Sequence, residues 1–341
     1  MLFKRRSSQY QPILKRRSLK KYSYQDNKFI IEIRKNTVKY NVDNVARTNA
    51  YAMFYENNKE IKWAFLASMV SRNAGWNMTD LWNKWYVLAL ELEVRRLFFL
   101  TFERANWIIF QDAYPQLLIY ELSKKLNKPM FHLLKAFNVS VFMEYEWNMF
   151  WEYRDYERIM YSLIINEQNM IQQPVIENKV FHKKVFKSLP YKLQELGHFS
   201  CVIFPTLQGK LYGSSVHGFE KIDNRINLGK RLAAILFSEE HYHSFYHFSK
   251  KNEHTGSRYD YEKFIHPRFT RETPFLRSCY PIIQHEKLID EDWLCKNEKK
   301  VKKWGRGISK EEINEITKWF LHKQHQMHGL IALNHWVLKK E

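Results

Sequence analysis

The chain is poor in the residues that mark several common classes of protein. Its 341 residues include only 3 cysteines, 10 glycines and 9 prolines. Three cysteines without a C-x-x-C spacing do not make a disulfide framework or a zinc ribbon, and they fit a reducing cytoplasm. Scarce glycine and proline, together with 45% hydrophobic residues, exclude a disordered or fibrous protein. No apolar run reaches the ~18 residues of a membrane span, and the amino terminus lacks the apolar core of a secretion signal.

Positive charge is abundant but unevenly placed. The formal net charge is +19, and residues 1–21 and 296–310 together contribute +14 of it. We therefore expect a flexible basic N-terminal tail over 1–28 and a helical domain over 29–341, with a boundary near 190–200 as an alternative. Such a patch suits nucleic acid or an anionic surface, although a charge run is more often a solvated tail. The basic residues of the tail are Lys4, Arg5, Arg6, Lys15, Arg16, Arg17, Lys20 and Lys21.

Apolar periodicity predicts a mostly α fold, a single multi-helix globular domain. Helices are expected over 45–56 and 60–73, the second ended by Gly75 as a helix C-terminal glycine. A helical region from 93 is expected to break at Asp112, which would cap a new helix that begins at Pro115. β-Branched and aromatic residues on both sides of "LQGK" predict one small β-hairpin near 201–216. A capping box at Ser309 predicts the start of the last helix.

Two stretches place charged and amide side chains among aromatic and apolar residues: "SRNAGWNMTDLW" (71–82) and "FERANWIIFQDAYPQ" (102–116). Buried charges are costly unless they pair, so these residues form either a structural polar network or a site. Glu103 is a candidate general acid with a raised pKa. A buried ion pair with Arg72 or Arg104 is the more common explanation of such a residue.

Arg72 also stands close to the predicted helix end at Gly75 and to a predicted helix start, capped by Asn77 or Thr79. Backbone N–H groups at a helix start attract anions, so this segment is a candidate anion site. Capping and an Arg–Asp bridge across the turn explain the same residues without a ligand. The candidate catalytic residues are Glu103, Asp112 and Asp80, and the candidate binding residues are Arg72, Asn77, Arg104, Arg258 and Asp260.

The segment "HTGSRYDYE" (254–262) combines a turn-forming glycine with polar residues that would line a pocket. The alternative is a packed loop held by a pair between Arg258 and Asp260. His243 and His247 lie one helical turn apart, but no H-E-x-x-H motif is present, so no metal and no cofactor are predicted.

Four motifs together are distinctive: "NVARTNAYAMFY", "WAFLASMVSRNAGWNMTDL", "ERANWIIFQDAYPQLLIYE" and "HTGSRYDYE". They resemble the YppC-like proteins of Bacillus and its relatives, a domain of unknown function, over nearly the whole chain from about residue 40. The resemblance implies a bacterial, cytoplasmic protein. It implies no activity and no catalytic residues.

The sequence therefore leaves the function unknown and two hypotheses open. The favoured hypothesis is a non-enzymatic binder of an anionic partner: nucleic acid, an anionic membrane surface or an acidic protein. The alternative is an enzyme of unknown reaction whose buried polar pocket is built from Arg72, Asp80, Glu103, Asp112 and Arg258.

Overall fold

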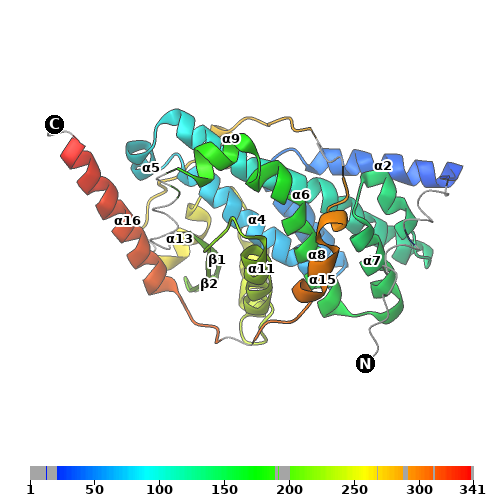
Figure 1. Cartoon of the computed structure of the whole chain (residues 1–341). Coiled ribbons are helices and arrows are strands. Elements are labelled where there is room, and N and C mark those ends of the chain that lie inside the picture. The colour runs from blue at the N-terminus through cyan, green and yellow to red at the C-terminus, as the bar shows by residue number, and fades with distance from the viewer. Residues whose placement is uncertain are drawn as a thin grey trace, which may run out of the picture.

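The computed structural model describes residues 13, 21–188, 191, 200–266, 268–286, 291–309 and 312–338, with backbone alone for 334–338. The fold is mostly helical with one two-stranded antiparallel sheet, as predicted. Helix α4 runs through the middle of the molecule, and the other elements surround it (Figure 1). No helix within the described ranges is long and apolar enough to cross a membrane.

The first described helix, α2 (Tyr24–Tyr40), begins inside the segment predicted as a flexible tail. Ser23 caps it, because its hydroxyl accepts from the backbone N–H of Asp26 and the Asp26 carboxylate accepts from that of Ser23. The tail prediction is therefore wrong for 24–28. Of the basic tail residues, only Lys21 lies within the described residues, where it is exposed and belongs to no helix or strand.

Helices α3 (Asn44–Asn57) and α4 (Lys62–Asp80) pack along each other. The predicted end of α4 at Gly75 is wrong, since the helix continues to Asp80. A Cβ atom at Gly75 would lie 2.4 Å from Asn44 Oδ1 and 2.9 Å from the His254 ring. The glycine thus permits a close approach of two side chains and does not end the helix.

Helices α5 (Lys84–Ala89) and α6 (Leu92–Leu126) follow, and α6 spans 35 residues without a break. The predicted break at Asp112 is wrong, and Pro115 lies inside the helix. Proline removes one helical hydrogen bond. Burial of Ala113, Tyr114 and Leu117 in the core offsets that loss, because tertiary packing overrides local propensity.

A layer of short helices packs against α6. It consists of a 3₁₀ helix, η1 (Phe131–Phe137), and the antiparallel pair α7 (Val141–Tyr153) and α8 (Tyr156–Met170). Trp147 is fully buried there and stacks on Phe131 and Tyr120. Two π-helical turns continue from this layer, η2 (Gln172–Ile176) and η3 (His182–Phe186), with α9 (Lys179–Phe181) between them.

The hairpin lies where the sequence predicts it. Strand β1 (Cys201–Pro205) pairs with β2 (Leu211–Ser215), and Gly209 at φ +77° forms the turn. Helices α11 (Ile222–Leu236) and α12 (Tyr242–Lys251) follow, then the short α13 (Tyr259–Ile265) and α14 (Leu276–Cys279).

Two helices complete the chain: α15 (Leu294–Trp304) and α16 (Thr317–Leu338). The predicted capping box at Ser309 does not begin the last helix, because residues 312–316 are irregular. The start of α16 lies near the hairpin, and its far end projects from the body (Figure 1).

Candidate functional site

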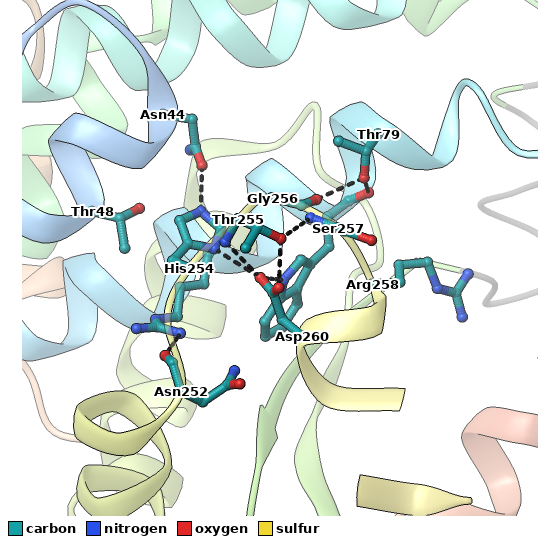
Figure 2. A network of polar contacts seen from close by, with 12 residues as sticks. Asn44, Thr48, Thr79, Asn252, His254, Thr255, Gly256, Ser257, Arg258 and Asp260 are labelled. Carbon is teal, nitrogen blue, oxygen red and sulfur yellow. Dashed lines mark hydrogen bonds and ion pairs between the residues drawn. The ribbon is translucent and has the colours of Figure 1, made fainter. Parts of the chain in front are cut away.

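The segment before α13 is the centre of a buried polar network (Figure 2). His254 Nε2 lies 2.8 Å from Asn44 Oδ1, and His254 Nδ1 lies 3.4 Å from Asp260 Oδ2. Asp260 also accepts from Trp76 Nε1 at 3.1 Å and from the Thr255 hydroxyl at 2.6 Å. We call these five residues the His254 network.

The charges and hydrogen bonds of the His254 network indicate a structural role. Burial lowers the pKa of His254, although Asp260 acts in the opposite direction. Burial alone would raise the pKa of Asp260, but hydrogen bonds from His254 and Thr255 lower it below its usual value. His254 and Asp260 are 1% and 3% exposed, and neither lines a described cavity. The network therefore fixes the loop before α13 against α3 and α4.

Arg72 does not form the predicted anion site. Its guanidinium donates to the carbonyls of Ser249 and Asn252, both at 3.0 Å, and so caps the end of α12. Burial lowers its pKa to about 10. The helix start expected near residues 77–79 is absent as well, since α4 passes through that segment.

Asp80 and Arg258 are brought together, with Nη1 of Arg258 3.1 Å from Oδ2 of Asp80. Nε of the same guanidinium lies 3.0 Å from Glu262 Oε1. The predicted pair between Arg258 and Asp260 therefore does not form. Burial raises the pKa of Asp80 to about 6, although Arg258 opposes the shift.

A small cavity lies beside Asp80 and Arg258. Its volume is about 40 Å³, room for a water molecule or a small ion. Tyr86 lines it, and Phe320 of α16 closes one side. Asn77, a predicted binding residue, is exposed and borders this cavity and a much larger one.

Glu103 is buried in an ion pair, as expected, but with a different partner. Its carboxylate pairs with Arg47 of α3 rather than with Arg72 or Arg104. His285 lies 3.6 Å from the other carboxylate oxygen. Arg104 is only partly buried and lies over the ring of Trp107.

Asp112 lies apart from Arg72, from the Asp80–Arg258 pair and from Glu103. It is 1% exposed and accepts from Asn166 Nδ2 at 2.6 Å and from Gln116 Nε2 at 2.7 Å. It therefore links α6 to α8 within the core. The five residues of the enzyme hypothesis do not share one pocket, because only Asp80 and Arg258 line the same described cavity.

The larger cavity has a volume of about 250 Å³ and lies between α4, α6, α8, α11 and β1. The π-helical turns η2 and η3 close another side through Val175 and Val185. Its walls are mostly apolar, and they include Leu66, Val70, Phe98, Ile109, Phe186 and Leu232. We call this the large cavity.

Arg47, Tyr51 and Glu167 form a polar part of the cavity wall, which we call the polar end, and the sequence did not reveal it. Glu167 accepts from Trp63 Nε1 at 3.1 Å and from Gln168 Nε2 at 3.0 Å. Burial raises the pKa of the Glu167 carboxyl to about 7. Tyr51 and Arg47, one helical turn apart on α3, also line this cavity. Glu167 stands between Ile164 and Ile171, at helical spacing on an apolar face, and that placement was the available signal.

Cofactor and metal ligands are not evident in this region. Among the described residues, no group of three or more His, Cys, Asp or Glu side chains is arranged to hold a metal ion. The three cysteines are free. Burial raises the pKa of the Cys201 thiol to about 12, so this thiol, which lines both cavities, is a poor nucleophile.

Comparison with known proteins agrees with the resemblance drawn from the motifs. The family model described as "Protein of unknown function (DUF2515)" matches residues 39–323. The uncharacterized protein YppC of Bacillus subtilis (strain 168) is 49% identical over 319 residues, which are 92% of this chain and 97% of that protein. No solved structure matches the chain significantly.

Removing the carboxylate of Glu103 is expected to destabilise the fold strongly. Glu103→Ala leaves Arg47 charged and buried without its partner, at a cost of about 3–5 kcal/mol. Glu103→Gln is expected to cost less, because its amide still accepts a hydrogen bond. Urea unfolding of both variants measures the difference. Glu93→Ala, which breaks an exposed pair with Arg96 on the same helix, is the control and should cost under about 1 kcal/mol. Equal losses at the two positions would contradict the burial argument.

The Glu167 carboxyl is expected to make stability depend on pH. Its folded pKa of about 7 exceeds the ordinary 4.5, so between these values the unfolded chain loses its proton first. Stability therefore falls as pH rises from about 4.5 to about 7, by at most on the order of 3 kcal/mol. Glu167→Gln should remove this loss, whereas Glu177→Gln at an exposed position should keep it. Thermal melts across this range test the difference, and parallel curves for Glu167→Gln and the parent would refute it.

Proposed function

We propose that this chain, which belongs to the DUF2515 family of proteins of unknown function, binds a small apolar molecule in the large cavity. The observation that carries the proposal is a cavity of about 250 Å³ with mostly apolar walls that also hold polar side chains. Small-molecule sites in proteins commonly have this composition, with the polar groups setting the orientation of the ligand.

The apolar walls of the cavity favour an apolar occupant. The cavity is reached from solvent beside Asn77, so water that enters it covers apolar surface. Removing apolar surface from water is worth about 25 cal/mol for each Å². A bound molecule that fills the space would recover much of this free energy.

The volume also limits the size of the occupant. An engineered apolar cavity of about 150 Å³ binds benzene. The large cavity is bigger and suits an alkylated ring or an alkyl chain of moderate length. Asn77 lines the wall and is exposed, so it marks a route from solvent.

Other readings have less support. The enzyme hypothesis requires Arg72, Glu103 and Asp112 beside Asp80 and Arg258, but the first three make separate contacts. The free cysteines favour the bacterial cytoplasm as the place where the protein acts.

One observation favours a second function, binding of an anionic partner. Helix α15 buries Leu294 and Trp304 against the body and exposes a row of basic side chains. Lys296 and Lys303 pair with Glu291 and Asp223. Three lysines and one arginine of this segment are exposed and make no ion pair among the described residues: Lys299, Lys300, Lys302 and Arg306. The N-terminal basic residues would add to this surface, and that part of the hypothesis remains a prediction.

Filling the large cavity is expected to weaken ligand binding strongly without loss of stability. Ala67 of α4 lines the cavity, and Ala67→Leu places a larger apolar side chain in it. Calorimetric titration with butylbenzene should show binding by the parent and at least about tenfold weaker binding by the variant. Cavity-filling substitutions are commonly neutral or stabilising, so the melting temperature should not fall.

Ala234→Leu, on the exposed side of α11, is the matched control and should bind butylbenzene like the parent. If Ala67→Leu does not fold, Ala105→Leu on the facing wall of α6 gives the same test. Unchanged butylbenzene affinity in a folded cavity-filling variant, or no binding by the parent, would overturn the proposal.

Reversing the charge of the α15 surface is expected to weaken binding to a nucleic acid. Substitution of Lys299, Lys300 and Lys302 by Glu should reduce affinity for duplex DNA. The slope of log affinity against log salt should fall by about 2.7 if each lysine meets one phosphate. The same change at the exposed Lys28, Lys35 and Lys39 of α2 is the control. Equal losses for the two triple variants would indicate non-specific attraction, and binding confined to anionic vesicles would indicate a membrane surface instead.

A further inference from the structure

Resting on the proposed function, we infer that the occupant of the large cavity is an alcohol, an apolar molecule whose single hydroxyl lies between Glu167 and Tyr51. The inference concerns the polar end of the cavity. Three residues from two helices line it: Arg47 and Tyr51 from α3 and Glu167 from α8. The charges of Arg47 and Glu167 both act on the phenol of Tyr51.

The ring of Trp63 contacts both Tyr51 and Glu167. Tyr51 packs edge-on against Trp63 with ring centroids 5.5 Å apart, and Trp63 Nε1 donates to Glu167 at 3.1 Å. Burial raises the pKa of Tyr51 well above its usual value, and the nearby charge of Glu167 raises it further. The phenol therefore stays protonated, as a hydrogen-bond donor, at every physiological pH.

The polar end has unused hydrogen-bonding capacity. Tyr51 is 3% exposed, and its hydroxyl has no hydrogen-bond partner among the described residues. Arg47 is 1% exposed, and its Nε also has no hydrogen-bond partner among the described residues. Oε2 of Glu167 accepts a hydrogen bond from Trp63 and Oε1 accepts one from Gln168, and each oxygen has a second lone pair. Buried polar atoms without partners are rare, and the two residues that carry them belong to the wall of a cavity large enough for a ligand.

A hydroxyl group matches this arrangement better than other simple head groups. It donates one hydrogen bond, to the ionised Glu167, and accepts others, from Tyr51. When Glu167 is protonated and becomes a donor, the hydroxyl still accepts. A carboxylate only accepts and would meet the negative charge of Glu167. An ether oxygen accepts but leaves Glu167 without a donor.

Arg225, the second buried arginine of the cavity wall after Arg47, does not favour an anionic head group on the ligand. Arg225 is 2% exposed, and burial lowers its pKa to about 10. All five of its N–H groups are already engaged, by the carbonyls of Phe219 and Glu220 and by Gln168 and Gln172. It therefore has no donor left for a ligand carboxylate or phosphate.

The test compares three probes of equal chain length by calorimetric titration of the full chain: octanol, its isomer heptyl methyl ether, and octanoate. We expect octanol to bind at least about fivefold tighter than the ether, since a missing hydrogen bond leaves buried polar groups unpaired. Octanoate should bind most weakly. Equal affinities of the two isomers, or a preference for octanoate, would overturn the inference.

Two variants assign the preference to this site. Tyr51→Phe should reduce the ratio of octanol to ether affinity at least about twofold, with the ether affinity unchanged. Tyr86→Phe removes a hydroxyl that borders only the small cavity, and it should keep the ratio. If Tyr51→Phe does not fold, Glu167→Gln should reduce the ratio as well, because a hydrogen bond to a carboxylate is about twice as strong as a neutral one.

The outcome also separates this inference from the proposed function. Binding of butylbenzene without a preference for octanol would leave the cavity proposal intact and remove the alcohol. Absence of binding by butylbenzene and by all three probes would remove both.

Discussion

The buried polar side chains of α4 need hydrogen-bond partners, and these partners position the second half of the chain around the helix. The helix is buried on nearly every side, yet it carries Arg72, Asn73, Trp76 and Thr79. Leaving such groups unbonded in the core would cost about 1–3 kcal/mol each. Each of them is bonded to the second half of the chain, and together they reach three segments of it. Arg72 holds the end of α12, and Asn73 exchanges two bonds of 2.8 Å with Ile203 of β1. Trp76 donates to Asp260, and Thr79 donates to the carbonyl of Gly256 at 2.6 Å.

This arrangement explains why the hairpin is where it is and why it borders both cavities. A two-stranded hairpin alone is marginal in water. Here β1 is anchored to α4 by the side-chain amide of Asn73, and its inner face packs Phe204 on Phe245 of α12. The same asparagine lines the large and the small cavity. The wall of the candidate site is thus held by hydrogen bonds as well as by apolar contacts.

The sequence predicted features governed by local rules and missed those set by distant contacts. The mostly α fold and the hairpin follow from neighbouring residues, and both predictions are confirmed. Glu103 was expected to be buried and paired, but Arg47 lies 56 residues away and nothing local identifies it. Gly75 was assigned the commonest role of a glycine near a helix end, whereas its role depends on His254, far along the chain. Glu167 was overlooked because a cavity has no sequence signature of its own.

The ties between α4 and the second half of the chain have a consequence for synthesis. Helix α4 ends at Asp80, but its partner Asp260 is made 180 residues later. At about 5–20 residues per second, α4 spends roughly 10–40 s outside the native arrangement after its own translation. In that interval Trp76 and Thr79 are without their final partners, whereas α3, α6 and α8, which also pack against α4, are made earlier. Productive folding of the nascent chain therefore depends on the packing of α4 against these helices until the residues around Asp260 emerge.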